Sequence, residues 1–233
     1  MREPTGSDVE WLFKATGYAA RDPVALERAL THRSVAGADN ERLEFLGDAV
    51  LSFVVADLLY AAFPAADEGE LSRFRAALVS GDELGAVAES VGIGARLRLG
   101  PGELRSGGFR RRSIMGDAFE AILGFVYLDG GIEATRALID RLWRPRIERL
   151  AVDPPQKDAK TRLQEWLQGR SMPLPVYSVV AVRGPPHAQT FTVRCQVEEP
   201  SLDTQAVGNS RRRAEQSAAE LALARIAALR SEA

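Results

Sequence analysis

Apolar residues recur every three or four positions through the first 150 residues of the chain. Residues at this spacing share one face of a helix, so the pattern predicts a helical region. The five expected helices span residues 24–31, 41–62, 70–91, 114–128 and 132–150. We expect Pro145 to kink or interrupt the last of them, because proline lacks the amide hydrogen that helical hydrogen bonding needs. Residues 106–113, which are rich in glycine and arginine, are expected to form a mobile basic loop.

The pattern changes after the paired prolines Pro154 and Pro155, which stop a helix and favour extended backbone. We therefore place a linker at residues 151–157. The expected elements beyond it are a short helix at 161–168, strands at 177–183, 190–197 and 204–208, and an alanine-rich helix that is capped by Ser210 and ends near 229. The predicted fold class is an all-α domain at 1–150 followed by an α-β-β-β-α domain at 158–229.

Composition narrows the class of protein. The chain has 233 residues, of which 45% are apolar and 27% charged, as is ordinary for a globular protein of one or two domains. Its one cysteine, Cys195, excludes an intramolecular disulfide, and its two histidines exclude a histidine-rich metal site. No apolar run approaches the roughly 20 residues of a membrane span, and the polar N-terminus is not a secretory signal. We therefore expect a cytoplasmic protein with no membrane partner.

The net charge of −2 by itself counts against a protein that binds nucleic acid, but it is the sum of two opposite parts. Residues 1–156 hold 19 basic and 24 acidic side chains, a net charge of −5. Residues 157–233 hold 11 basic and 8 acidic side chains, a net charge of +3. The two parts therefore need separate explanations.

Carboxylates gather on one face of each of two expected helices. At about 100° per residue, Glu41, Glu44 and Asp48 fall within an arc of about 60°. Asp117 and Glu120 lie three residues apart on one face of the fourth helix. The apolar stripes opposite these acids, which we expect in the core, contain Leu43, Leu46, Val50, Phe53 and Val54 on the second helix and Phe119, Ile122, Leu123 and Val126 on the fourth.

These acidic faces have two interpretations. Most such clusters are solvated helix faces. Here no basic residue follows at the i+4 position to relieve the repulsion, and converging carboxylates repel unless a cation lies between them. Gly47 and Gly116 leave the backbone bare near the acids, which suits close approach of the two helices. Oxygen ligands with almost no histidine favour Mg²⁺ or Mn²⁺ over zinc, so we expect a metal site.

Phe45 projects about 40° from the carboxylate arc, on a side where the core of its own subunit is not expected. A large aromatic side chain in that position needs cover. A neighbouring loop or a partner subunit could provide it, and the pattern leaves both open. We interpret His32 mainly as a structural or capping residue and Cys195 as a core residue of a strand.

Three elements of the second domain point to an anionic ligand. The short helix presents Thr161, Gln164 and Glu165 on a polar side, and the loop after the first strand carries His187. Arg211–Arg213 open the last helix, where the macrodipole disfavours cations, so an external phosphate would resolve the conflict. Each element alone is more often a solvated surface. Their combined spacing fits successive minor grooves and the intervening phosphates of double-stranded RNA.

These residues resemble the ribonuclease III family of double-stranded-RNA-specific endonucleases. The run NERLEFLGD at Asn40–Asp48 resembles the family signature, and DAFEA at Asp117–Ala121 resembles its second acidic motif. Residues 158–229 resemble a double-stranded-RNA-binding domain, and the likeness covers nearly the whole chain. The resemblance implies a Mg²⁺-dependent homodimer in which Mn²⁺ can substitute, with double-stranded RNA as partner and no small-molecule cofactor.

The resemblance also implies a role for each candidate residue. Glu41, Asp48 and Glu120 would be catalytic, and the metal ligands would be Glu44, Asp48, Asp117 and Glu120. Phe45 would insert into the partner subunit, and Glu68 matches a further acid of the catalytic valley. The RNA contacts would be Thr161, Gln164, Glu165 and His187 in the minor groove and Arg211, Arg212 and Arg213 on phosphates.

The implied reaction is hydrolysis of double-stranded RNA to 5′-phosphate and 3′-hydroxyl ends with short 3′ overhangs, in the processing of rRNA precursors and some mRNAs. Two alternatives are kept. A non-cleaving double-stranded-RNA-binding regulator would be expected to have lost at least one carboxylate, and none is missing here. A DNA structure-specific nuclease fits the acids but leaves the second domain unexplained.

Overall fold

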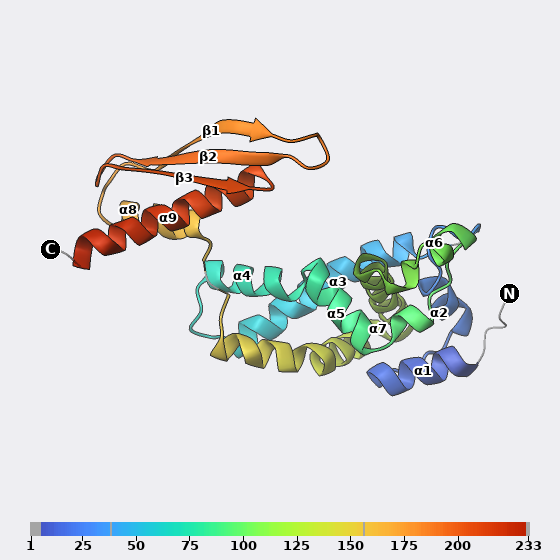
Figure 1. Cartoon of the computed structure of the whole chain (residues 1–233). Helices are drawn as coiled ribbons and strands as arrows, with labels where there is room; N and C mark the ends of the chain where they lie inside the picture. The colour runs from blue at the N-terminus through green and yellow to red at the C-terminus, as the bar shows by residue number, and fades with distance from the viewer. Residues whose placement is uncertain (1–5, 38, 156, 232–233) are drawn as a thin grey trace. The chain divides into compact units, whose positions relative to one another are not determined.

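The computed structural model describes residues 6–37, 39–155 and 157–231, which form two compact units that divide after Pro155. The first unit is helical (Figure 1). Its helices are α1 (Gly6–Thr16), α2 (Pro23–Ala29), α3 (Glu41–Ala62), α4 (Glu68–Leu78), α5 (Gly81–Ser90), α6 (Pro101–Arg105) and α7 (Arg112–Val152). Two 3₁₀ turns, η1 (Ile93–Ala95) and η2 (Gly108–Arg110), flank α6.

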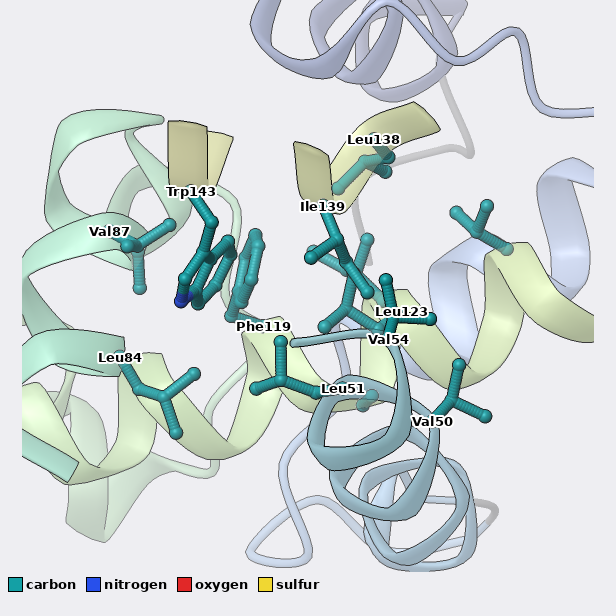
Figure 2. Packing of buried hydrophobic residues seen from close by; sticks show 14 of the residues in the cluster. Val50, Leu51, Val54, Leu84, Val87, Phe119, Leu123, Leu138, Ile139 and Trp143 are labelled. Carbon is teal, nitrogen blue, oxygen red and sulfur yellow. The ribbon is translucent and has the colours of Figure 1, made fainter. Parts of the chain in front are cut away.

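The core of the first unit forms where α3 packs against α7. Leu51 and Val54 of α3 share a buried cluster with Phe119 of α7 (Figure 2). Phe119 in turn stacks on Trp143, with ring centroids 5.7 Å apart. Between Ile114 and Val126, α7 is buried on nearly all sides. The two carboxylates on this stretch, Asp117 and Glu120, are therefore half-buried rather than set on an open helix face.

The helix expected at 70–91 is two helices, α4 and α5. Asp67 and Glu70 form a capping box that starts α4 two residues earlier than expected. Ser80 caps α5, its hydroxyl accepting from the Glu83 amide at 3.4 Å. A second N-cap inside an apolar-periodic stretch ends one helix and begins another, and apolar spacing alone does not reveal it.

Two expected helices are joined in α7. Its run of helical backbone is broken at Gly131, where φ is 81° and ψ is −179°. This conformation is essentially restricted to glycine. The helix continues through Pro145, so the interruption is wrong and the kink stays a prediction. Trp143 and Ile147, on either side of the proline, are buried and hold that part of the helix against the core.

Among the described residues, the helices α1 and α6 and the turns η1 and η2 were not predicted by the apolar pattern. In α1, Leu12 is fully buried and the Trp11 indole N–H donates to the carbonyl oxygen of Val91 at 2.8 Å. The basic loop expected at 106–113 contains the turn η2, and α7 begins inside it at Arg112. The expectation of an irregular loop is therefore only partly right.

The second unit is a three-stranded antiparallel sheet in the order β1-β2-β3, with two helices on one face (Figure 1). Its elements are α8 (Ala159–Gln168), β1 (Val176–Arg183), β2 (Thr190–Val197), β3 (Leu202–Gly208) and α9 (Arg211–Ser231). This is the predicted α-β-β-β-α order. Val193, Cys195 and Val197 are buried on one face of β2, as the alternation predicts. The Ser210 hydroxyl accepts from the Arg213 amide at 3.2 Å, which confirms the predicted cap.

Among the described residues, α3 alone is long and apolar enough to cross a membrane by length and composition. The sequence pattern had indicated no segment that approaches a membrane span, and α3 does approach one in length and hydropathy. Core helices of globular domains pass the same test. Here α3 packs against α7 and carries Glu41, Glu44 and Asp48 on one side, which is the arrangement of a core helix with a polar face.

Candidate active site

The two carboxylate-bearing helices cross at a pair of glycines. A Cβ atom on Gly47 would lie 1.7 Å from the carbonyl oxygen of Glu120, and one on Gly124 would lie 2.2 Å from that of Leu43. No side chain fits at such distances, so the backbones of α3 and α7 approach this closely only because both residues are glycine. Gly47 has the predicted role. Gly116 does not, because it faces α5, and Gly124 is the partner in the crossing.

The crossing brings carboxylates of both helices together. Glu44 on α3 and Asp117 and Glu120 on α7 each offer an oxygen atom, and these atoms lie within 4.8 Å of one another. That spacing allows them to share one cation. Asp48, the fourth predicted ligand, is exposed and lies outside this group, although its charge acts on Glu120. We call Glu44, Asp117 and Glu120 the acid group.

The pKa values of all three members of the acid group are raised. Burial, followed by the charges of Asp48, Glu44 and Asp117, raises the pKa of Glu120 to about 8. Burial and neighbouring acids also raise the pKa of Glu44. Burial raises the pKa of Asp117, although nearby basic side chains oppose the rise. A bound cation relieves such repulsion, and a donor set made only of oxygen fits Mg²⁺ or Mn²⁺.

A hollow of about 610 Å³ opens beside the acid group. Its wall contains two ion pairs: Arg33 with Glu41 at 3.2 Å, and Arg111 with Glu103 at 3.1 Å. Glu41, predicted to be catalytic, is more than half exposed, so the ion pair with Arg33 lies where solvent and substrate can reach it. The hollow therefore has acids on one side and ion-paired arginines along its wall.

Sequence reasoning did not place His32, Arg111 or Ser113 at the site, yet all three line the hollow. His32 comes from the loop before α3, whereas the other two belong to the start of α7. No spacing rule relates these segments, and only the packing of α3 on α7 brings them together. Glu68, matched by resemblance to a further acid, accepts from the Ser72 hydroxyl at 2.8 Å and is not in the acid group.

Phe45 is 81% exposed, and nothing in the described part of the chain covers it, which counts against a neighbouring loop as its cover. Phe53 and Tyr60 are also exposed and lie within about 80° of it around α3. We call these three residues the apolar stripe of α3. Phe53 was expected in the core, and this is wrong, because the buried positions beside it are Val54 and Val55.

The predicted RNA contacts of the second unit are exposed, except Thr161, which is half-buried. Arg211–Arg213 begin α9, and Arg212 lies close enough to the start of α8 to lower the pKa of Asp158. The N-terminal ends of the two helices are thus neighbours. Glu165 of α8 accepts from Lys157 at 2.7 and 2.8 Å, and His187 is exposed in the turn between β1 and β2. The structure thus brings the N-terminal ends of α8 and α9 together.

Known proteins share the two-domain order of this chain. Residues 22–146 match the Ribonuclease-III-like family, and residues 159–226 match the double-stranded RNA binding motif. Two curated relatives called Ribonuclease 3, from Vibrio vulnificus (strain YJ016) and Nitrosococcus oceani, are each 52% identical. The alignments cover 93% of this chain in both cases, and 96% and 94% of the relatives.

Solved structures agree with the sequence relatives. A structure of the nuclease domain of ribonuclease III from Campylobacter jejuni, which reports flexibility in a region involved in dimer formation, is 39% identical with a TM-score of 0.57. It covers 59% of this chain and 96% of that one. A second structure of the same domain is 38% identical with a TM-score of 0.56, covering 68% of this chain and 100% of that one.

The fold and the site define a nuclease joined to a double-stranded-RNA-binding motif. The chain belongs to the ribonuclease III family and is an endoribonuclease. The family is metal-dependent in general, and the acid group could bind a metal ion. The RNA-binding motif indicates double-stranded RNA as the ligand.

Proposed function

We propose that the chain is a Mg²⁺-dependent endonuclease that hydrolyses double-stranded RNA to 5′-phosphate and 3′-hydroxyl ends. The observation that carries the proposal is the convergence of Glu44, Asp117 and Glu120 at the α3–α7 crossing, with oxygen atoms within 4.8 Å. These residues would hold the ion, and Asp48 would join them from its exposed position on α3. Mn²⁺ would substitute, because it also takes oxygen ligands.

Bound there, the ion supplies Lewis-acid activation of water and neutralises charge that develops at the phosphate. The residues of the chain hold and orient the reactants. Glu120, half-buried beside the crossing, is kept at a fixed position in which a nearby cation favours its ionised form. Glu41, which is exposed at the hollow and paired with Arg33, would accept a proton from water. We assign catalytic roles to Glu41, Asp48 and Glu120.

We further propose a homodimer that is joined through the apolar stripe of α3. Phe45, at 81% exposure, would insert into the partner subunit. Exposed large aromatic residues on one face typify a protein–protein contact. Two acid groups acting on one duplex would cut both strands at offset positions and leave short 3′ overhangs.

We propose that residues 158–229 bind the RNA duplex and that residues 1–150 cleave it. Thr161, Gln164, Glu165 and His187 would contact the minor groove, and Arg211–Arg213 would contact phosphates. The net charge of +3 over residues 157–233 supplies an attraction that the acidic nuclease domain lacks. We place this activity in the cytoplasm, in the processing of rRNA precursors and some mRNAs.

Substitution of single acids tests the proposal. Glu120→Gln and Asp117→Asn keep the side-chain shape, so both are expected to bind duplex RNA normally yet lose at least about 100-fold in cleavage rate with Mg²⁺. Glu133→Gln, at an exposed position of the same helix, is the matched control and should cleave like the wild type. Normal cleavage by both site variants would contradict the proposal. Wild-type protein that binds without cutting would favour the regulator instead.

The substrate class needs its own measurement. Duplex DNA lacks the 2′-hydroxyl groups that the second unit is proposed to contact. Unlabelled DNA duplex should therefore compete poorly against labelled RNA duplex of the same sequence. Equal competition by the two duplexes would favour a DNA-directed nuclease.

A further inference from the structure

His32 lies in the wall of the hollow, in a loop that fixes the orientation of its ring. The Ser34 backbone N–H donates to His32 Nδ1 at 3.2 Å, and the Ser34 Oγ lies 2.8 Å from the same nitrogen. The Ser34 Oγ also accepts from the Gly100 N–H at 2.9 Å. The His32 backbone N–H donates to the carbonyl oxygen of Arg98 at 3.0 Å. The loop that holds the ring is thus tied to the segment 98–100.

These contacts determine which ring nitrogen carries the hydrogen. A backbone N–H can only donate, so Nδ1 acts as acceptor and the neutral ring of His32 carries its hydrogen on Nε2. The Nε2–H group lies on the opposite side of the ring from Ser34. Within the described part of the chain it has no hydrogen-bond partner.

The two arginines in the wall of the hollow are already engaged. The Arg33 guanidinium pairs with Glu41 at 3.2 Å, and that of Arg111 pairs with Glu103 at 3.1 Å. Each arginine therefore has its charge balanced by a carboxylate of the protein. His32 differs because its Nε2–H is a donor that the protein itself does not use. A ligand in the hollow is the group that can accept from it.

We propose that His32 is a further catalytic residue whose Nε2–H donates to a non-bridging oxygen of the phosphodiester that is cut. Ser34 would be the positioning residue that holds the ring for this contact. The inference rests on the proposed function, because it places RNA in the hollow beside the acid group. Negative charge on the phosphate oxygens grows as water attacks, so a fixed donor stabilises the transition state more than the bound substrate.

A histidine donor suits this wall better than another arginine or lysine. The hollow also contains Glu44 and Asp117, which are needed for the metal ion. A further arginine or lysine would pair with those carboxylates and compete with the ion for them. A histidine N–H held by Ser34 contacts the phosphate without that competition.

Single-turnover cleavage of an RNA duplex separates the chemical step from binding. His32→Ala should cut about 30- to 300-fold more slowly while its Kd for the duplex stays within about threefold of the wild type. His32→Gln offers an amide N–H near the Nε2 position and should recover at least about tenfold of that loss. Ser34→Ala should lose about fivefold, and Ser34→Thr, which keeps the hydroxyl, should restore it. Ser90→Ala removes a hydroxyl at the end of α5, outside the hollow, and should change the rate less than about twofold.

Sulfur substitution at the scissile phosphate tests the contact at the level of one atom. Sulfur accepts hydrogen bonds weakly, so one of the two phosphorothioate isomers should slow the wild type in Mn²⁺ and slow His32→Ala much less. Such non-additivity is expected when the ring and the oxygen interact directly. His32→Leu has a similar length and no N–H donor, so it serves for the same experiment if His32→Ala does not fold.

Two outcomes overturn the assignment of His32. One is a His32→Ala protein that cleaves as fast as the wild type, and the other is equal slowing of both proteins by the sulfur isomer. A wild-type protein that fails to cut RNA overturns the proposed function instead, so the two failures are distinguishable. Sulfur at the phosphate one nucleotide away serves as the control for the substrate.

Discussion

Gly47 and Gly124 lie in direct backbone contact where α3 crosses α7. A Cβ atom on Gly47 would lie 2.9 Å from the Gly124 amide nitrogen, and one on Gly124 would lie 3.1 Å from the Gly47 amide nitrogen. Glu44 and Glu120 each come within about one helical turn before one of these glycines. The glycine pair therefore fixes the relative position of the acids, and the acid group is a consequence of how closely the two helices pack.

A methyl group at the crossing should disrupt both stability and the site. Gly124→Ala must push the helices apart, so we expect a loss of roughly 2–4 kcal/mol of unfolding free energy and at least tenfold in cleavage. Gly116→Ala is the matched control on the same helix, because its Cβ would meet its nearest neighbour at an ordinary 3.6 Å. Urea denaturation measures the unfolding free energy of both variants. Equal midpoints for the two variants would show that the crossing tolerates a side chain.

The acid group should make the metal-free protein less stable as the pH rises. The pKa of Glu120 is raised from 4.5 to about 8 in the folded protein. At a pH above 4.5, ionisation of Glu120 therefore costs free energy in the folded state that it does not cost in the unfolded state. Relative to Glu120→Gln, the wild type should lose stability progressively between about pH 4.5 and pH 8. The loss should be of the order of 1–2 kcal/mol, allowing for partial exposure.

Thermal melting in a chelator measures this difference. The two proteins should melt alike at pH 4, below both values of the Glu120 pKa, and should diverge towards pH 9. Added Mg²⁺ should raise the melting temperature of the wild type more than that of Glu120→Gln. A difference that stays constant across the pH range would contradict the assignment of repulsion to Glu120.

Charge in the apolar stripe should dissociate the proposed dimer. Phe45→Asp would place a carboxylate in the subunit contact, so we expect a monomer at micromolar concentration, and cleavage reduced at least tenfold. Phe13→Asp on α1 is the matched control, because Phe13 is also exposed, at 55%, and lies outside the stripe. Sedimentation equilibrium gives the mass of each. A Phe45→Asp protein that remains dimeric would remove the stripe from the interface.

The basic start of α9 should set the salt dependence of RNA binding. If Arg212 neutralises a phosphate, Arg212→Gln should lower the slope of log K against log salt concentration by about one. Arg225→Gln, near the other end of the same helix, is the matched control and should leave the slope unchanged. Titrations at several salt concentrations give both slopes, and identical slopes for the two variants would place the phosphates elsewhere.

Local patterns predicted most of the elements and the acids, because helical spacing is a property of neighbouring residues. Glu44 and Glu120 follow from the 3.6-residue period alone, and the order α-β-β-β-α follows from a change of period after Pro155. The division of the helix expected at 70–91 into α4 and α5 was not predicted, because the apolar spacing continues across Ser80. The capping serine itself is present in the sequence.

The rest depended on how α3 and α7 rotate against each other. Gly116 and Gly124 are equivalent candidates in the sequence, and only the packed helices show that Gly124 faces Gly47. The same rotation exposes Phe53 and puts His32 at the hollow. Tertiary packing sets these relations, and no local period encodes them.

The central claim is metal-dependent hydrolysis of double-stranded RNA at the acid group. Its most direct test is incubation of the wild-type protein with a perfect RNA duplex, with and without Mg²⁺, followed by analysis of the product ends. We predict cuts in both strands only when Mg²⁺ is present, with 5′-phosphate and 3′-hydroxyl ends and short 3′ overhangs. Equal cutting in a chelator, or 2′,3′-cyclic phosphate ends produced by attack of the ribose hydroxyl in place of water, would contradict the account.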